Sequence, residues 1–325
     1  MEHVAWLLLV GVGLAGIAAN LLVLITIRFS LLFLTQFNIV SRCEASLQTV
    51  ANICVQSLCM VDLLYSSIGL PVMIAIYHWD TIEDDLEGDL VDDTVFNPLW
   101  CLPNFFFSCS LHHVLLLTVD RFTAIIRPLS YSISVVTKKS FILATITIIW
   151  IANAVWYFGP LLIIDLTCFY HSTTKRIIHN ITIAILWILP IVVILVMYIS
   201  IVYEVFLRKR CRVGDLGGSP SQVQLRGAVT IFWIVLIFLL TCLPNSIYSF
   251  LHYLDDKGKL FGLSADTQRI LSISTNLFKA TNCFLNPLIY FIRMKRFKTT
   301  LLFRLWKRST STIKVATTDL DFNKI

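Results

Sequence analysis

The chain has 325 residues, of which 57% are hydrophobic and only 14% are charged, and its formal net charge is +6. Soluble domains average about 25% charged residues, so the composition, with a mean hydropathy of +0.79, excludes an ordinary soluble domain. A large soluble helical protein is excluded as well, because its buried helices would need amphipathic partners to cover them.

Seven apolar blocks follow one another along the chain, separated by polar stretches. They are Val4–Ile27, Val50–Tyr77, Leu99–Ile125, Phe141–Ile164, Ile181–Phe206, Ala228–Leu251 and Ile270–Ile292. A helix needs about 20 apolar residues to cross the hydrocarbon core, and backbone exposed to lipid must hydrogen-bond to itself. The pattern predicts an all-α membrane protein, a bundle of seven transmembrane helices whose two termini lie on opposite sides of the membrane.

The basic residues predict which way the chain faces. If the N-terminus is outside, the segments on the cytoplasmic side hold 20 of the 26 Lys and Arg residues, and the outer segments hold five. An excess of Lys and Arg in cytoplasmic loops is the rule for membrane proteins. We therefore expect the N-terminus outside and the C-terminus in the cytoplasm.

The segment between the second and third blocks is acidic. It carries eight carboxylates and no basic residue: Asp80, Glu83, Asp84, Asp85, Glu87, Asp89, Asp92 and Asp93. Such a loop would attract a cationic ligand by steering, or it is a solvated loop whose like charges repel. The composition favours the solvated loop.

Each apolar block contains polar, aromatic or proline residues that stand out from its aliphatic sequence. In chain order these are Asn20, Asp62, Asp120-Arg121-Phe122 with Pro128-Leu129-Ser130-Tyr131 after it, Trp150 and Pro160, Pro190 and Tyr198, Phe238 and Pro244, and Asn282, Asn286, Pro287 and Tyr290. This set, in this order, resembles the rhodopsin-like (class A) G-protein-coupled receptors, as an orphan-like member. The resemblance extends over residues 4–306.

The resemblance implies a signalling mechanism at the plasma membrane. Arg121 would pair with Asp120 at rest and turn toward a heterotrimeric G protein when the sixth helix moves out. Proline kinks a spanning helix, so Pro190, Pro244 and Pro287 would let the helices swing. Tyr198 and Tyr290 would hold the open state, and Asn286 would link this region to Asp62. An ordinary interfacial ion pair at Asp120 and Arg121 would contribute little.

The resemblance also implies a sodium site and a disulfide. Hard oxygen ligands suit such a cation, and the matching positions are Asp62, Ser110, Asn282 and Asn286. The alternative is a protonated Asp62 that is hydrogen-bonded to Asn286. Cys101 and Cys168 would form an external disulfide, and no other cofactor is expected.

The C-terminal part predicts a further short helix and a tail. The basic stretch Arg293–Lys298 and the apolar residues up to Trp306 indicate an amphipathic eighth helix on the inner leaflet. We expect one receptor domain over 1–306 and a flexible cytoplasmic tail over 307–325. The tail's Ser and Thr residues would be phosphorylated and bound by an arrestin, or the tail is simply disordered.

The sequence departs from the family's pattern on the outer side. Cys242 replaces the Trp that usually stands two residues before Pro244, and no acid lies between Asp93 and Asp120, so the salt bridge of amine receptors is absent. Lys279 stands one residue from the position at which opsins hold retinal, now Ala280, which disfavours a photoreceptor. Lys279 would contact an anionic ligand or pair with an acid of the outer loops.

The ligand is expected to be a small molecule or a short peptide. Only three residues precede the first block, which disfavours a large protein ligand. The candidate contacts are Asn104, Phe107, Asn245, Tyr248 and Lys279. The alternatives are a divergent amine- or opsin-like receptor or a transporter, although no internal repeat is present. The chain carries no His-Glu-x-x-His or Gly-x-Ser-x-Gly motif, so we expect no enzyme, and no nucleic-acid partner.

The stretch from Phe29 to Val40 is long for a first inner loop and mostly apolar. It would extend the first helix or fold on the membrane face.

Overall fold

The computed structural model describes residues 2–37, 42–76, 98–131, 138–163, 181–182, 184–211, 222–254 and 262–293. These residues are helical apart from short connections. The elements are α1 (Glu2–Phe37), α2 (Arg42–Leu64), the π-helical segment η1 (Tyr65–Gly69), α4 (Pro98–Ile126), α5 (Pro128–Tyr131), α6 (Lys139–Ile163), the π-helical segment η4 (Ala184–Ile188), α9 (Leu189–Cys211), α10 (Gln222–Leu254) and α11 (Ala265–Arg293). Helix α2 continues through η1 to residue 76, and η4 runs directly into α9.

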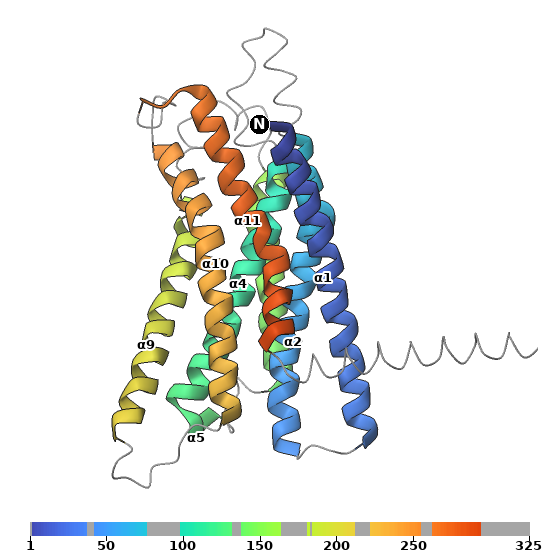
Figure 1. Ribbon diagram of the computed structural model, residues 1–325, viewed down its shortest axis with the longest axis vertical. Coiled ribbons are helices and arrows are strands. Elements are labelled where there is room, and N and C mark those ends of the chain that lie inside the picture. Colours follow the sequence, from blue (N-terminus) through green and yellow to red (C-terminus); the bar gives the residue numbers. More distant parts are fainter. Residues whose placement is uncertain are drawn as a thin grey trace, which may run out of the picture.

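The long helices run side by side along the long axis of the molecule (Figure 1). Helix α11 packs against α10 on one side and α1 on the other, while α4 packs against α2, α6, α9 and α10. We call the end that holds α5 the lower end and the end where α1 and α11 begin the upper end, as they are drawn in Figure 1. The arrangement agrees with the expected all-α bundle.

The surface of the bundle is apolar, as lipid requires. Within the described ranges, five helical segments are long and apolar enough to cross a membrane, and a shorter apolar stretch lies at Val235–Leu251 in α10. Helix α11 is less apolar because it carries buried polar residues, among them Asn276, Lys279, Asn282 and Asn286. Large apolar side chains such as Ile148, Val155 and Ile199 point outward and are exposed. A soluble protein rarely exposes so many, whereas hydrocarbon solvates them.

Helix α4 is the centre of the bundle. Of an 18-residue apolar window within Cys101–Ile126, 72% is buried, compared with 17% of such a window within Lys139–Gly159 in α6 and 28% of one within Trp6–Ile27 in α1. Polar side chains on a helix that is surrounded on all sides must find partners within the protein, because an unpaired polar group in the interior is costly. The polar residues of α4 are therefore the place to look for function.

Two π-helical segments, η1 and η4, interrupt the α-helical pattern, and the apolar pattern of the sequence does not predict them. Each is followed closely by a proline, Pro71 after η1 and Pro190 after η4. A proline has no amide hydrogen to donate to the carbonyl four residues earlier, and that carbonyl belongs to residue 67 in η1 and residue 186 in η4. The wider π-helical turn accommodates a carbonyl that receives no hydrogen bond from the proline. Single π-helical turns of this kind are frequent at functional sites.

The structure decides one open question and leaves others outside its range. Helix α1 continues to Phe37, so most of the apolar stretch after Arg28 extends the first helix. The eighth helix, the tail at 307–325, the acidic segment around Asp80–Asp93 and Cys168 lie outside the described residues.

Helices α1 and α11 approach each other closely at Asn20 and Gly16. Asn20 is fully buried, and its side-chain nitrogen donates to the carbonyl oxygens of Gly16, at 2.9 Å, and of Cys283, at 2.7 Å. A methyl group at Gly16 would collide with the hydroxyl of Ser66 and lie 3.0 Å from the sulfur of Cys283. The contact therefore requires a residue without a side chain.

We expect Gly16→Ala to lower the stability of the bundle by about 1–3 kcal/mol, the usual cost of overpacking a filled interior. The measurement is thermal unfolding of the purified chain in lipid nanodiscs. Gly11 is the matched control, since a methyl group there would meet nothing within 4 Å. Equal midpoints for Gly16→Ala and Gly11→Ala would show that the close packing is not needed.

Candidate functional site

A buried charged cluster lies at the lower end of α4. Asp120 is fully buried. The side chain of Arg121 forms an ion pair with Asp120, and its Nε donates to Asp120 Oδ2 at 2.8 Å. The hydroxyl of Tyr131 in α5 donates to the other oxygen, Asp120 Oδ1. Charge-assisted bonds of this kind are about twice as strong as neutral ones, so the carboxylate fixes both Arg121 and α5.

Tyr131 remains a hydrogen-bond donor in this cluster. Burial of the ring, together with the neighbouring carboxylate of Asp120, raises the pKa of Tyr131 well above its usual range. The hydroxyl therefore keeps its proton at physiological pH and donates it to Asp120.

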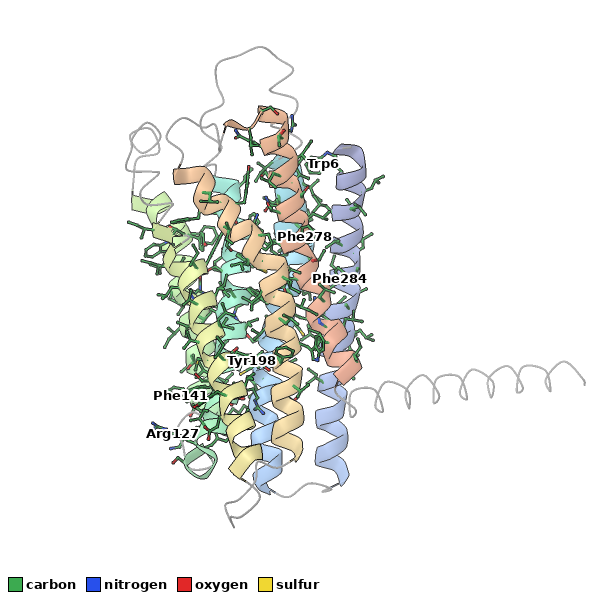
Figure 2. All side chains as sticks on the ribbon, turned by 60° about the vertical axis from the view of Figure 1, so that its left-hand side comes forward. Trp6, Arg127, Phe141, Tyr198, Phe278 and Phe284 are labelled. Atoms are coloured by element: carbon green, nitrogen blue, oxygen red, sulfur yellow. The ribbon has the colours of Figure 1, made fainter. Side chains whose placement is uncertain are left out.

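Tyr198 of α9 lies near this cluster but does not bond to it. Its ring stacks on Phe232 of α10 with a centroid separation of 5.0 Å, and it packs with Ile125 and Ile201. Figure 2 shows Tyr198 on the lower half of α9, with Arg127 lower still. The structure thus pairs Arg121 with Asp120 and leaves Tyr198 in an apolar contact. Tyr290 lies in α11, and its side chain is outside the described residues.

A second polar centre joins three helices at Asp62, which is 2% exposed. Ser110 of α4 donates its hydroxyl to Asp62 Oδ1 at 2.8 Å, and the side-chain nitrogen of Asn286 in α11 donates to Asp62 Oδ2 at 2.9 Å. Both carboxylate oxygens are therefore hydrogen-bonded. Three of the four residues expected around a cation are brought together by these bonds.

The oxygens of this centre are suitable ligands for a cation. The side-chain oxygens of Asn282 and Asn286 are buried, and neither has a hydrogen-bond partner among the described residues. Asn282 and Asn286 stand four residues apart on α11 and so share one face. A buried amide oxygen without a partner is costly, and a small hard cation bound to oxygen ligands would remove that cost.

A third cluster surrounds Lys279 in the middle of α11, and it contains a residue that the sequence analysis missed. Lys279 is 3% exposed. Its ammonium lies 5.2 Å from the ring centroid of Phe107 in α4 and 5.5 Å from that of Trp187 in η4. Trp187 contacts Phe107 edge-on, and its Nε1 donates to the hydroxyl of Tyr157 at 3.1 Å.

The charge of Lys279 is only partly compensated. Within the described part of the chain Lys279 makes no ion pair; the salt bridge found there joins Arg121 to Asp120. A cation–π contact contributes about 2 kcal/mol when it is desolvated, whereas the burial of an ion costs several kcal/mol. Among the residues that the structure describes, the two aromatic contacts therefore leave Lys279 short of a counter-charge.

The other expected ligand contacts divide into two groups. Asn245 and Tyr248 of α10 both face α11: Asn245 donates to the hydroxyl of Thr275 at 3.4 Å, and the hydroxyl of Tyr248 donates to the carbonyl oxygen of Gln268 at 3.0 Å. Asn104 of α4 is half-buried. Phe107 and Lys279 are in direct contact, so the structure brings these two residues together.

The histidines of α4 belong to the packing of the core. The two ring nitrogens of His113 contact the hydroxyl of Ser57 in α2 and the carbonyl oxygen of Cys109, each at 2.7 Å. The ring also packs edge-on against Trp150 of α6. No group of three or more His, Cys, Asp or Glu side chains that would hold a metal exists among the residues searched. Cys101 has no disulfide partner within the described ranges, and its pairing with Cys168 remains a prediction.

Comparison with known proteins identifies the family. The sequence model of the 7 transmembrane receptor (rhodopsin family) matches residues 38–290, which is 253 of the 325 residues. Human chemokine XC receptor 1 is 26% identical over 79% of this chain and 72% of its own length. Mouse olfactory receptor 1165 is 25% identical over 81% of each chain. The chain therefore belongs to the rhodopsin family of seven-transmembrane receptors and is a G-protein-coupled receptor, not an enzyme.

Proposed function

We propose that this receptor lies in the plasma membrane with its N-terminus outside, binds a small molecule or a short peptide there, and activates a heterotrimeric G protein at the lower end of the bundle. The observation that carries the proposal is the buried cluster of Asp120, Arg121 and Tyr131. Asp120 holds the guanidinium group of Arg121 at the lower end of α4 by hydrogen bonds that a conformational change can break.

The orientation is supported by charge. Twenty of the 26 basic residues fall on the side that the proposal places in the cytoplasm, in agreement with the positive-inside rule. Arg121 and α5 lie on the same side, where a cytoplasmic partner would meet them. The two relatives are named for a chemokine and for odorant reception, so their names do not agree on one class of ligand.

The proposed mechanism is a shift between two states. In the resting state Asp120 holds Arg121 and Tyr131. In the active state α10 moves away from α4, the contact between Tyr198 and Phe232 opens, and Arg121 turns toward the G protein. A ligand drives this change only by the difference between its affinities for the two states.

We propose further that a sodium ion binds beside Asp62 in the resting state. Asp62, Ser110, Asn282 and Asn286 would hold it, because they offer a carboxylate and two partnerless amide oxygens. The alternative is a protonated Asp62 that needs no cation. Asp62 and Asn286 join α2 to α11, so an ion there would stabilise the arrangement of the helices that the structure records.

The test is a G-protein dissociation assay in cells that express the receptor, with a library of small molecules and short peptides and with basal signalling recorded. We expect a signal that disappears in Arg121→Ala at equal surface expression. Arg127→Ala is the matched control, because Arg127 is exposed six residues further along. A response that survives Arg121→Ala would sink the mechanism, and a receptor with neither a response nor basal signalling would contradict the proposal.

A further inference from the structure

The cluster around Lys279 lies where four elements meet above the Asp62 centre. Lys279 comes from α11, Phe107 from α4, Trp187 from η4 and Cys242 from α10. Phe107 precedes Ser110 by three residues, so it lies about one helical turn above the residue that bonds to Asp62. Lys279 follows Ala265 by 14 residues, which is about 21 Å along a helix from its upper end.

The ring of Phe107 is held firmly in this place. It lies parallel to the ring of Phe238 in α10, at 6.2 Å and an angle of 9°, and Trp187 contacts it edge-on at 5.0 Å. Trp187 is in turn anchored by its bond to Tyr157. The ammonium therefore lies against two aromatic rings that are each packed against other side chains of the core.

A second polar group without a full set of partners lies one turn above Lys279. Asn245 is 2% exposed, and its side-chain oxygen has no hydrogen-bond partner in the part of the chain that the structure describes. Its nitrogen faces Thr275, which stands four residues before Lys279 on the same face of α11. The buried ammonium and the buried amide oxygen thus belong to levels about one helical turn apart; within the described residues the oxygen has no hydrogen-bond partner and the ammonium makes no ion pair.

We propose that Lys279 binds the carboxylate of a small organic acid, whose apolar body extends upward past Asn245. This inference rests on the proposed function, since it names the class of ligand for the same receptor. A carboxylate supplies the counter-charge that the aromatic rings cannot, and charge-assisted bonds are the strong ones in a dry site. An amine would be repelled by Lys279, and a neutral head group would leave the ammonium uncompensated.

The depth of the cluster limits the ligand. An acid that reaches Lys279 from the upper end has a narrow head and a slender apolar or aromatic body, because the ammonium lies against Phe107 and Trp187, and Phe107 is stacked in turn on Phe238. The side-chain oxygen of Asn245 favours a ligand whose apolar part carries one hydrogen-bond donor, such as a hydroxyl or an N–H group.

The binding test uses the full chain in nanodiscs of zwitterionic lipid and follows its thermal midpoint without a G protein. The probes are octanoate and 4-phenylbutyrate, each with its amide and its amine as matched neutral and cationic compounds. We expect the carboxylates alone to raise the midpoint of the wild type. In Lys279→Met the apparent affinity for the carboxylates should fall about 100-fold or more, as for the loss of one partner of a buried ion pair.

The variant also separates two explanations of the buried charge. Without any probe, Lys279→Met should unfold at a higher temperature than the wild type, because it replaces an uncompensated ion with an apolar side chain of similar size. A lower midpoint would mean that Lys279 pairs with an acid of the outer segments, and would overturn the inference. Lys139→Met is the matched control: Lys139 is exposed at the start of α6, so neither the midpoint nor the response to probes should change.

The readouts distinguish this inference from the function on which it rests. Carboxylates that stabilise the wild type and not Lys279→Met support the inference even if no G protein responds, in which case the proposed coupling fails alone. Basal G-protein signalling without any selective stabilisation by carboxylates contradicts the inference and leaves the proposed function standing.

Discussion

Asp120→Asn is expected to raise basal G-protein activation about tenfold over the wild type at equal surface expression. Asparagine keeps the shape of the side chain but removes the charge that attracts Arg121. Hydrogen bonds to charged groups contribute about 1.5–3 kcal/mol, and a loss of about 1.4 kcal/mol already changes a two-state equilibrium tenfold. The measurement is G-protein dissociation in cells without added ligand.

Tyr131→Phe provides a graded comparison for this prediction. It removes only the hydroxyl that donates to Asp120 and leaves the ion pair with Arg121 in place. Its basal activation should lie between those of the wild type and Asp120→Asn. If Asp120→Asn signals no more than the wild type, the ion pair does not restrain the resting state.

Asp62→Asn is expected to abolish the effect of sodium on stability. A ligand that binds only the folded state at ten times its dissociation constant stabilises it by about 1.4 kcal/mol, so NaCl should raise the thermal midpoint of the wild type above its value in choline chloride. The variant lacks the carboxylate that attracts the ion. The two salts should therefore give it the same midpoint.

The control for this experiment is Ser67→Ala, five residues along the same helical stretch. Ser67 is exposed, and its hydroxyl bonds only to the backbone oxygen of Leu63. This variant should keep the sodium effect of the wild type. A sodium effect that persists in Asp62→Asn would show that sodium acts at another place, and a wild type with equal midpoints in the two salts would favour a protonated Asp62 with no cation beside it.

The bundle and its polar centres were predictable because lipid imposes simple rules. Backbone in hydrocarbon must be helical, so long apolar blocks translate directly into spanning helices. A charged or amide side chain inside a block is costly and needs a partner, which made Asp62, Asp120 and Asn286 stand out. The bonds of Asp62 to Ser110 and Asn286 then required only that the helices pack in the family's order.

The contact between Lys279 and Trp187 was not predictable from the pattern. A tryptophan in an apolar block looks like any other core residue, and nothing in its spacing relates it to a lysine 92 positions later. Its orientation depends on η4, and a π-helical turn shifts every following side chain relative to an α-helix. Only the three-dimensional arrangement shows that Lys279 lies against both Trp187 and Phe107, the second of which is one of the candidate ligand contacts.

The C-terminal end of α1 differs from the end of the first apolar block. The apolar block ended near Ile27, while α1 continues to Phe37. The block ends there because the charged Arg28 follows, but a single charge does not end a helix, and the residues after Arg28 are again mostly apolar.

The most direct test of the account is to add Arg121→Ala to Asp120→Asn and to measure basal G-protein dissociation. The double variant leaves no unpaired buried charge, so it avoids the folding cost of removing Arg121 alone. If Arg121 is the group that acts on the G protein, the raised signal of Asp120→Asn should fall to that of cells without receptor. A double variant that signals as strongly as Asp120→Asn would contradict this role for Arg121.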